Sequence, residues 1–303
     1  MRRILAALAL SFAVAVQAET LQERLGYAPG AKLLIVHADD LGMAQTINAA
    51  SFAALETGLV NSASIMIPCP WLPEVVDYAK KNPRADLGLH LTLTSEWTSL
   101  RWGPLLSRAQ VPTLFDRDGY LYLTESEAAK VIDARQAEAE IRAQIARARA
   151  LGIVPTHLDS HMGTLYQTKE LFQALMRVAR EEKIPARVSR AHLQNPFIAG
   201  TLRPGDIVID HIISIGSDVP ASEWSKWYTE AIRNMKPGVT EVIVHLAYDT
   251  PEMRGAAVNH PHWGSEWRQR DFDYFTSDDF RTLLRENNIR LITWRDLARL
   301  IND

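Results

Sequence analysis

The sequence predicts an α/β protein with a single domain, folded as a (β/α) barrel with long loops around an active site. Short apolar runs alternate with segments of helix composition along most of the chain, which indicates a parallel sheet covered by helices. Residues 19–303 contain no repeat, low-complexity tract or flexible linker, and their length suits one barrel better than two domains. Polar residues gather where the apolar runs end, and barrel enzymes carry their catalytic groups at such positions.

About eight apolar runs are expected to be strands, and the segments between them supply the helices. The expected strands cover 32–38, 62–67, 86–93, 154–158, 186–189, 206–213, 241–246 and 289–293. The expected helices cover 45–57, 73–81, 125–151, 169–182, 222–235 and 277–287. Gly58 closes the first helix, and Ala, Glu, Arg and Gln dominate the third. Residues 94–124 lack clear periodicity and are rich in Trp, Pro, Gly and Asp, which is typical of a functional loop.

The composition excludes several classes of protein. Hydrophobic residues make up 47% and charged residues 23% of the chain, which excludes a disordered chain, a collagen-like fibre and a coiled coil. The chain has 33 Lys and Arg residues and 36 Asp and Glu residues, so it has no excess of basic residues to neutralise a phosphate backbone. Nucleic acid is therefore not an expected partner. The single cysteine, Cys69, excludes an intramolecular disulfide and a cysteine-rich zinc site.

The first eighteen residues are expected to be a signal peptide. Arg2 and Arg3 precede an apolar run too short to span a bilayer comfortably, and residues 16–18 (VQA) form a small-x-small cleavage pattern. An uncleaved anchor is the alternative. We therefore expect residues 19–303 to be the mature domain, exported by a bacterium to the periplasm or the medium, with no membrane span after cleavage.

Five polar side chains lie at the ends of separate expected strands. Asp39 and Asp40 follow the first strand, His90 lies in the third, and His161 and His245 lie at or beyond the ends of the fourth and seventh. Because the carboxyl ends of barrel strands meet, these side chains could converge on one pocket. One carboxylate and two imidazoles are a common ligand set for a catalytic divalent metal, and the other two groups could supply a base and an acid. The set predicts metal-assisted hydrolysis of an amide or ester.

Each of these residues also has a structural alternative. One of the two aspartates could cap the following helix, and His90 or His245 could be a hydrogen-bonded core histidine. The H-x-D-x-H run at 157–161 could be a polar strand end, although its three charged or polar residues would share one face of an extended segment. A sugar-binding protein without activity, and a hydrolase of a non-sugar amide or ester, are the alternatives for the whole chain.

Four segments resemble the YdjC/ChbG-like carbohydrate deacetylases, which are related to the NodB-type polysaccharide deacetylases. These segments are HADDLGMAQTIN (37–48), GLHLTLT (88–94), THLDSHMG (156–163) and VIVHLAYD (242–249). The resemblance covers most of the chain and implies a distorted (β/α) barrel. It also implies removal of the acetyl group from N-acetylated amino sugars or oligosaccharides, with one divalent metal ion, Mg²⁺ or Zn²⁺, as the cofactor.

The resemblance assigns roles to the same five residues. It implies that Asp40, His90 and His161 bind the metal and that Asp39 is the general base. It further implies that a protonated His245 donates a proton to the leaving amine.

The expected substrate contacts are Asp159, which follows the fourth strand, and Arg101 and Trp102, which follow the third. The sequence departs from the family pattern after the fourth and seventh strands, so the disaccharide specificity of the family does not carry over. Tryptophan rings in the connecting segments could stack on sugar faces. His260 and His262 are further candidates for substrate contacts.

The expected signal peptide leads to a direct prediction. We expect the protein isolated from the envelope or medium of its native host to begin at Glu19, because residues 16–18 form the cleavage pattern. N-terminal sequencing or mass spectrometry of the intact chain measures this. Soluble protein that keeps residues 1–18 would contradict the prediction.

Overall fold

A computed structural model describes residues 19–302, so the expected signal peptide, residues 1–18, lies outside the described residues. The strands are β1 (Lys32–Leu41), β2 (Ser62–Ile65), β3 (Leu87–Leu91), β4 (Leu158–Ser160), β5 (His211–Ile213), β6 (Gly238–Val244) and β7 (Ile289–Leu291). The α-helices are α1 (Leu21–Arg24), α2 (Gln45–Thr57), α3 (Leu72–Lys81), α4 (Glu125–Val131), α5 (Ala134–Ala150), α6 (Lys169–Glu182), α7 (Pro196–Ala199), α8 (Trp224–Arg233), α9 (Pro251–Ala256), α10 (Ser265–Phe275), α11 (Asp278–Glu286) and α12 (Trp294–Asn302). Short 3₁₀ helices are η1 (Pro112–Leu114), η2 (His161–Tyr166), η3 (Arg190–Gln194) and η4 (Ala221–Glu223).

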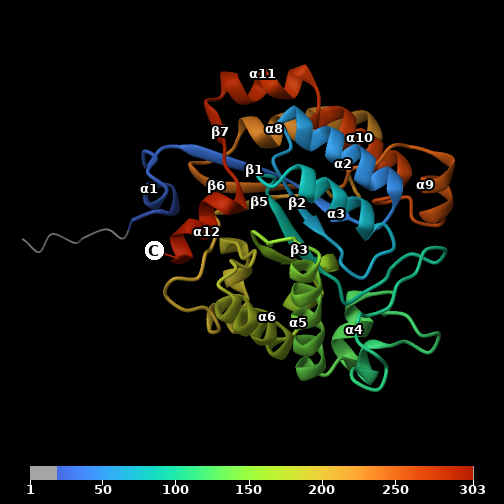
Figure 1. Cartoon of the computed structure of the whole chain (residues 1–303). Helices are drawn as coiled ribbons and strands as arrows, with labels where there is room; N and C mark the ends of the chain where they lie inside the picture. Colours follow the sequence, from blue (N-terminus) through green and yellow to red (C-terminus); the bar gives the residue numbers. More distant parts are fainter. Residues whose placement is uncertain (1–18, 303) are drawn as a thin grey trace, which may run out of the picture.

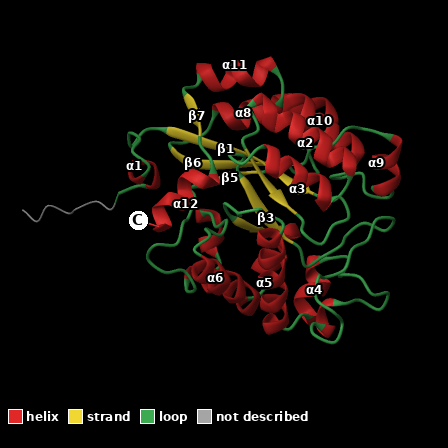
Figure 2. Ribbon diagram, in the orientation of Figure 1, coloured by secondary structure: helices red, strands yellow, loops and turns green. Residues whose placement is uncertain are grey.

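The strands form one parallel sheet that curls into a distorted barrel, as the sequence predicts. The strand order is β4-β3-β2-β1-β6-β5, and β7 pairs with the first residues of β1 (Figure 2). Single parallel bridges join Leu158 to Ala186 and Ser189 to Ile209, so the segment between β4 and β5 occupies the place of a further strand. Helices α2, α8, α10 and α11 lie on one side of the sheet and α5 and α6 on the other (Figure 1).

The strands are shorter or shifted relative to the sequence prediction. The expected strand at 186–189 makes only single bridges, and the expected strand at 206–213 narrows to His211–Ile213. The fourth strand begins at Leu158 rather than at Val154. The first strand extends beyond its expected end to Leu41, because its pairing with β2 resumes at Leu41 after an irregularity at the two aspartates.

The helix expected at 125–151 is two helices. Helix α4 ends at Val131, and Asp133 begins α5 by accepting hydrogen bonds from the backbone N–H groups of Arg135 and Gln136. Asp is a favoured N-cap residue, so Asp133 indicates in the sequence itself that a second helix begins here.

The sequence prediction also missed α9, α10 and α12. Helix α10 places Arg268 and Asp271 on its buried side, so the apolar periodicity that identifies a helix is weak there. In the part of the chain that the structure describes, no helix is long and apolar enough to cross a membrane.

Alternate residues of β1 face the inside of the barrel. Leu33 and Ile35 pack on Trp294 in an apolar base at the amino-terminal end of the strands. His37 lies above them, hydrogen-bonded to side chains of β2 and to Asp159. The barrel therefore has an apolar base and a polar upper interior.

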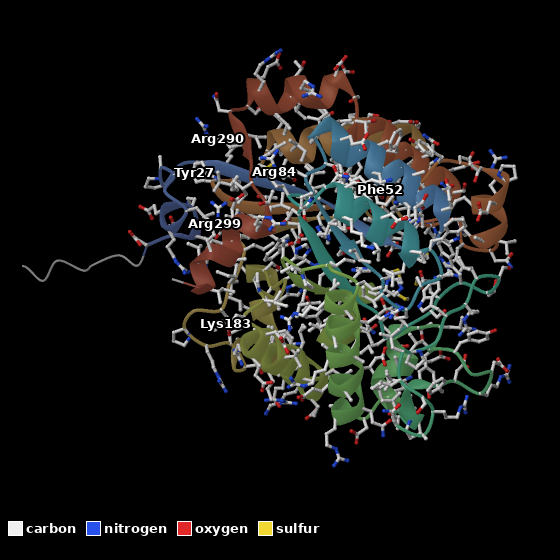
Figure 3. All side chains as sticks on the ribbon, in the orientation of Figure 1. Tyr27, Phe52, Arg84, Lys183, Arg290 and Arg299 are labelled. Atoms are coloured by element: carbon white, nitrogen blue, oxygen red, sulfur yellow. The ribbon has the colours of Figure 1, made fainter. Side chains whose placement is uncertain are left out.

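The side-chain view locates several residues outside the sheet. Figure 3 shows Tyr27, Arg290 and Arg299 at the end of the molecule where α1 and α12 lie. Phe52, labelled on α2, stacks on Tyr78 of α3 with ring centroids 4.0 Å apart, which joins these two helices. The 94–124 connection lies at the opposite end and contains only the short helix η1, which agrees with the expected long loop (Figure 1).

Gly88 of β3 tests the packing inside the barrel. A Cβ at this position would lie 2.4 Å from atoms of the buried His157 ring, which itself stacks on Trp294. We expect Gly88→Ala to lower the free energy of unfolding by roughly 1–3 kcal/mol, as overpacking does in other cores. Chemical denaturation measures this. Gly30→Ala is the control, because a Cβ at Gly30 meets no atom within 4 Å; equal stability of the two variants would contradict the prediction.

Candidate active site

The carboxyl end of β1 brings two adjacent carboxylates to one centre. Neighbouring residues of a regular strand point to opposite faces. Here Asp40 has a positive φ of 74°, and the pairing of β1 with β2 shifts by one residue between Ala38 and Leu41. As a result Asp39 Oδ2 lies 3.8 Å and Asp40 Oδ1 3.3 Å from the same atom, Nε2 of His90.

Two nearby residues hold this turn. Gly42 has a φ of 96°, and a Cβ there would lie 3.2 Å from the Met66 carbonyl oxygen, so a glycine is required. The Gly42 N–H donates to Asn48 Oδ1 at 2.7 Å, which explains the Asn of the HADDLGMAQTIN segment. The N-cap of α2 is Ala44 and lacks a side-chain cap, so neither aspartate plays the alternative capping role.

Asp40, His90 and His161 form a buried group that could hold a metal ion. One potential ligand atom from each lies within 4.8 Å of the others. Asp40 Oδ1 is buried and accepts no hydrogen bond from the described residues, although a buried oxygen without a partner is costly. A cation among these three side chains satisfies that oxygen, so the residues present fit a divalent metal ion.

A carboxylate orients each of the two imidazoles. Asp159 Oδ1 lies 2.6 Å from His90 Nδ1, and Glu96 Oε2 lies 2.8 Å from His161 Nε2. Each ring therefore keeps its other nitrogen for Asp40 or for a metal, as carboxylate–histidine pairs do in metal sites. Sequence reasoning missed Glu96, because a single acid in an aperiodic loop carries no pattern.

Asp159 has a different place from the expected one. Its carboxylate is fully buried, bonded to His90 and His37, and lies outside the cavity lining described below. Burial would raise its pKa, but the neighbouring His90 and Arg187 charges hold the pKa of Asp159 well below its usual range. Asp159 is thus a residue behind the site that orients His90, rather than the expected substrate contact.

Arg101 and Trp102 are the other two expected substrate contacts. The Arg101 guanidinium binds Asp116 Oδ2 at 2.9 Å and the Leu121 carbonyl oxygen, and the Trp102 indole donates to the Thr94 carbonyl oxygen. Within residues 19–302, neither lines the cavity. Both side chains bind within the 94–124 loop, and the Trp102 ring also packs edge-on against His161 at a centroid distance of 6.1 Å. Their expected contact with substrate stays a prediction.

Asp39 and His245 face each other across the site. Their atoms Oδ2 and Nε2 lie 3.9 Å apart. Burial would raise the pKa of Asp39, but His90, Arg187 and a hydrogen bond from His37 hold it well below its usual range. Burial lowers the pKa of His245 to about 4, so its imidazole is neutral at pH 7. The expected role of His245 as the proton donor to the leaving amine stays a prediction.

Two buried arginines complete the site, and sequence reasoning named neither. Arg268 Nη2 donates to Asp40 Oδ2 at 2.7 Å and leaves Oδ1 towards the two imidazoles. Arg187 Nη1 lies 3.5 Å from Asp39 Oδ1. Arg187 stands in an expected strand, where a charged residue was a usable signal, whereas Arg268 lies on a helix that was not predicted.

These groups form the floor of a cavity of about 720 Å³. Asp39, Asp40, His90, His161 and His245 all line it, so the five residues predicted to converge do so. The 94–124 loop and the 260–263 segment supply the walls, and His260 and His262 are among their lining residues. The volume lies within the range of about 300–1,000 Å³ that is usual for small-ligand sites.

The fold and the site define a barrel protein with a candidate metal centre at the carboxyl ends of its strands. The chain belongs to the YdjC-like protein family, whose model matches residues 33–286. It is 30% identical over 289 residues to a carbohydrate deacetylase of Thermus thermophilus, covering 91% of this chain and 97% of that protein. It is 29% identical over 166 residues to a chitooligosaccharide deacetylase of Yersinia pestis, covering 54% and 62%. A solved structure from Enterococcus faecalis V583 superposes with a TM-score of 0.75 at 24% identity, covering 88% and 99%.

The candidate centre predicts pH-dependent metal binding. Burial would lower the pKa of His161, but Glu96 and Asp40 raise it to about 9 in the metal-free protein. That proton must leave before the imidazole binds a metal, so we expect affinity to fall about tenfold per pH unit and per released proton below pH 9. Calorimetry with Zn²⁺ in buffers of different ionisation enthalpy measures both affinity and proton release.

Variants of the two imidazoles provide the matched test of this centre. We expect His90→Ala and His161→Ala to lose most bound Zn²⁺ in equilibrium dialysis, because each removes one of the three donors. His211→Ala, at the start of β5 and outside the cavity lining, should bind as the parent does. Unchanged metal content in both site variants would exclude this centre.

Proposed function

We propose that this protein is a metal-dependent carbohydrate deacetylase. It hydrolyses the N-acetyl group of amino sugars or their oligosaccharides to acetate and a free amine. The observation that carries the proposal is the buried set of Asp40, His90 and His161 beside Asp39 and His245 on the floor of one cavity. The deacetylase relatives support the sugar substrate.

The cofactor in this proposal is one divalent ion, Zn²⁺ or Mg²⁺, held by Asp40, His90 and His161. Two imidazoles with one carboxylate suit Zn²⁺, and the carboxylate also suits Mg²⁺. When bound, such an ion supplies Lewis-acid polarisation of the acetyl carbonyl and lowers the pKa of water.

Asp39 accepts the proton of the attacking water in this proposal. Its low pKa keeps the carboxylate ionised, and His37 and Arg187 fix its Oδ1, which leaves Oδ2 towards the cavity groups.

His245 receives that proton and delivers it to the leaving nitrogen. Asp39 Oδ2 and His245 Nε2 lie 3.9 Å apart, so a small approach of the two groups brings them within hydrogen-bond distance for this transfer. The imidazolium is then a strong acid next to the departing amine. One proton thus travels from water to the amine, and His245 returns to its neutral resting form.

We also propose that the protein acts outside the cytoplasm. The support is the sequence of residues 1–18, with two arginines, an apolar run and a small-x-small end. Acetylated glycans of cell walls and of the surroundings are then within its reach.

Release of acetate from N-acetylglucosamine and its β-1,4 oligomers, with added Zn²⁺ or Mg²⁺, tests the proposed function. We expect turnover by the parent protein and a loss of roughly 10²–10⁴-fold in kcat for Asp39→Asn, because the amide cannot accept a proton. Asp39→Asn should keep its metal. Asp40→Asn should instead lose metal affinity, because a neutral amide oxygen is a weaker ligand.

Two results would contradict this assignment. Acetate release from none of these sugars with either metal would overturn the deacetylase proposal. Loss of metal by Asp39→Asn, with metal and activity retained by Asp40→Asn, would reverse the two roles.

A further inference from the structure

The cavity has a polar floor and an apolar rim. Leu123, Met162 and Trp263 line it, and each side chain is more than a third exposed although large and apolar. Large apolar side chains that line a cavity and remain exposed can form part of a binding surface. The same cavity is lined by the charged groups of the candidate metal centre, so it offers both polar and apolar surface. Sugar rings likewise have polar hydroxyl groups and apolar C–H faces.

Trp263 is the largest of the three, and the backbone is built to present it. Its φ of 55° is in the left-handed region, which bulky residues rarely adopt. The next residue must be a glycine, because a Cβ on Gly264 would overlap the His260 carbonyl oxygen. A strained backbone conformation persists only where the surrounding structure holds it in place, and such conformations are found often at ligand-binding sites.

The chain also fixes Trp263 relative to the candidate metal centre. Arg268 Nε donates to the Trp263 carbonyl oxygen at 2.6 Å while its Nη2 donates to Asp40 Oδ2 at 2.7 Å. One buried guanidinium therefore joins the loop that carries the exposed indole to a residue of the metal set. The buried Trp267 packs against the Trp263 ring at a centroid distance of 5.0 Å and limits its movement.

We propose that Trp263 is a stacking platform for the sugar ring next to the acetylated one, so that the enzyme prefers oligosaccharides to a single N-acetylated sugar. This inference rests on the proposed deacetylase function. The acetamido group occupies the polar floor, where the proton-transfer groups lie. The C–H face of the neighbouring ring then packs on the indole, which offers a large apolar surface at low conformational cost.

Kinetics on sugars of increasing length test this platform. The probes are N-acetylglucosamine, its β-1,4 dimer and its trimer, each followed by acetate release. We expect Trp263→Ala to raise KM for the dimer and trimer about tenfold, with kcat and the monomer kinetics unchanged. Trp263→Phe should recover most of the loss, because an aromatic face remains.

Trp71→Ala is the matched control, since Trp71 is 38% exposed against 39% for Trp263 but does not line the cavity. It should leave all constants unchanged. An equal effect of Trp263→Ala on monomer and oligomers, or no effect on either, would overturn the platform. If the parent protein releases no acetate from any probe, the proposed function fails; calorimetric binding of the trimer then decides the platform separately, and equal affinity of parent and Trp263→Ala overturns it.

Discussion

The left-handed conformation of Asp40 is the constraint on which the site depends. A regular strand would send Asp39 and Asp40 to opposite faces of the sheet, one into the barrel and one into the helix layer. The extra residue in β1 and the positive φ turn both carboxylates towards His90. Gly42, with its positive φ, and Asn48, which accepts a hydrogen bond from the Gly42 N–H, stabilise that turn. The two aspartate side chains are chemically identical and differ only in their partners. Asp40 binds Arg268, whereas Asp39 lies next to His37 and Arg187.

Beneath the site, the barrel holds charges that a purely structural core would lack. Arg187 lies 3.4 Å from Asp159 Oδ2 and 3.9 Å from Glu241 Oε2, and all three are buried. Burial would lower the pKa of His37, but Asp159 and Asp39 raise it to about 10 and keep the ring charged. Replacing such ion pairs with apolar residues often stabilises a protein. Here the positive groups keep the carboxylates ionised and in fixed positions, which is a requirement of the site rather than of the fold.

The sequence was sufficient to predict the barrel, the long loop and the convergence of five residues, because strand ends in this fold meet at one edge. It failed where tertiary contacts override local pattern. Helix α10 was missed because Arg268 faces inward, and the strand expected at 186–189 makes only single bridges, because apolar composition does not determine how a segment pairs. Asp159, next to predicted ligands in sequence, lies behind one of them in space. Position along the chain cannot separate a residue that touches substrate from one that orients a ligand.

The pairing of β1 also governs how the chain can fold. Lys32, at the start of the central strand, pairs with Gly238 and with Ile289, which are made long after it during synthesis. Such non-local pairing forms slowly, because a long loop must close before any contact is gained. Until then, the apolar β1 presents an unpaired edge that other chains can join. The longest strand of the finished barrel, buried at all but its first residue, is therefore an open edge in the incomplete chain.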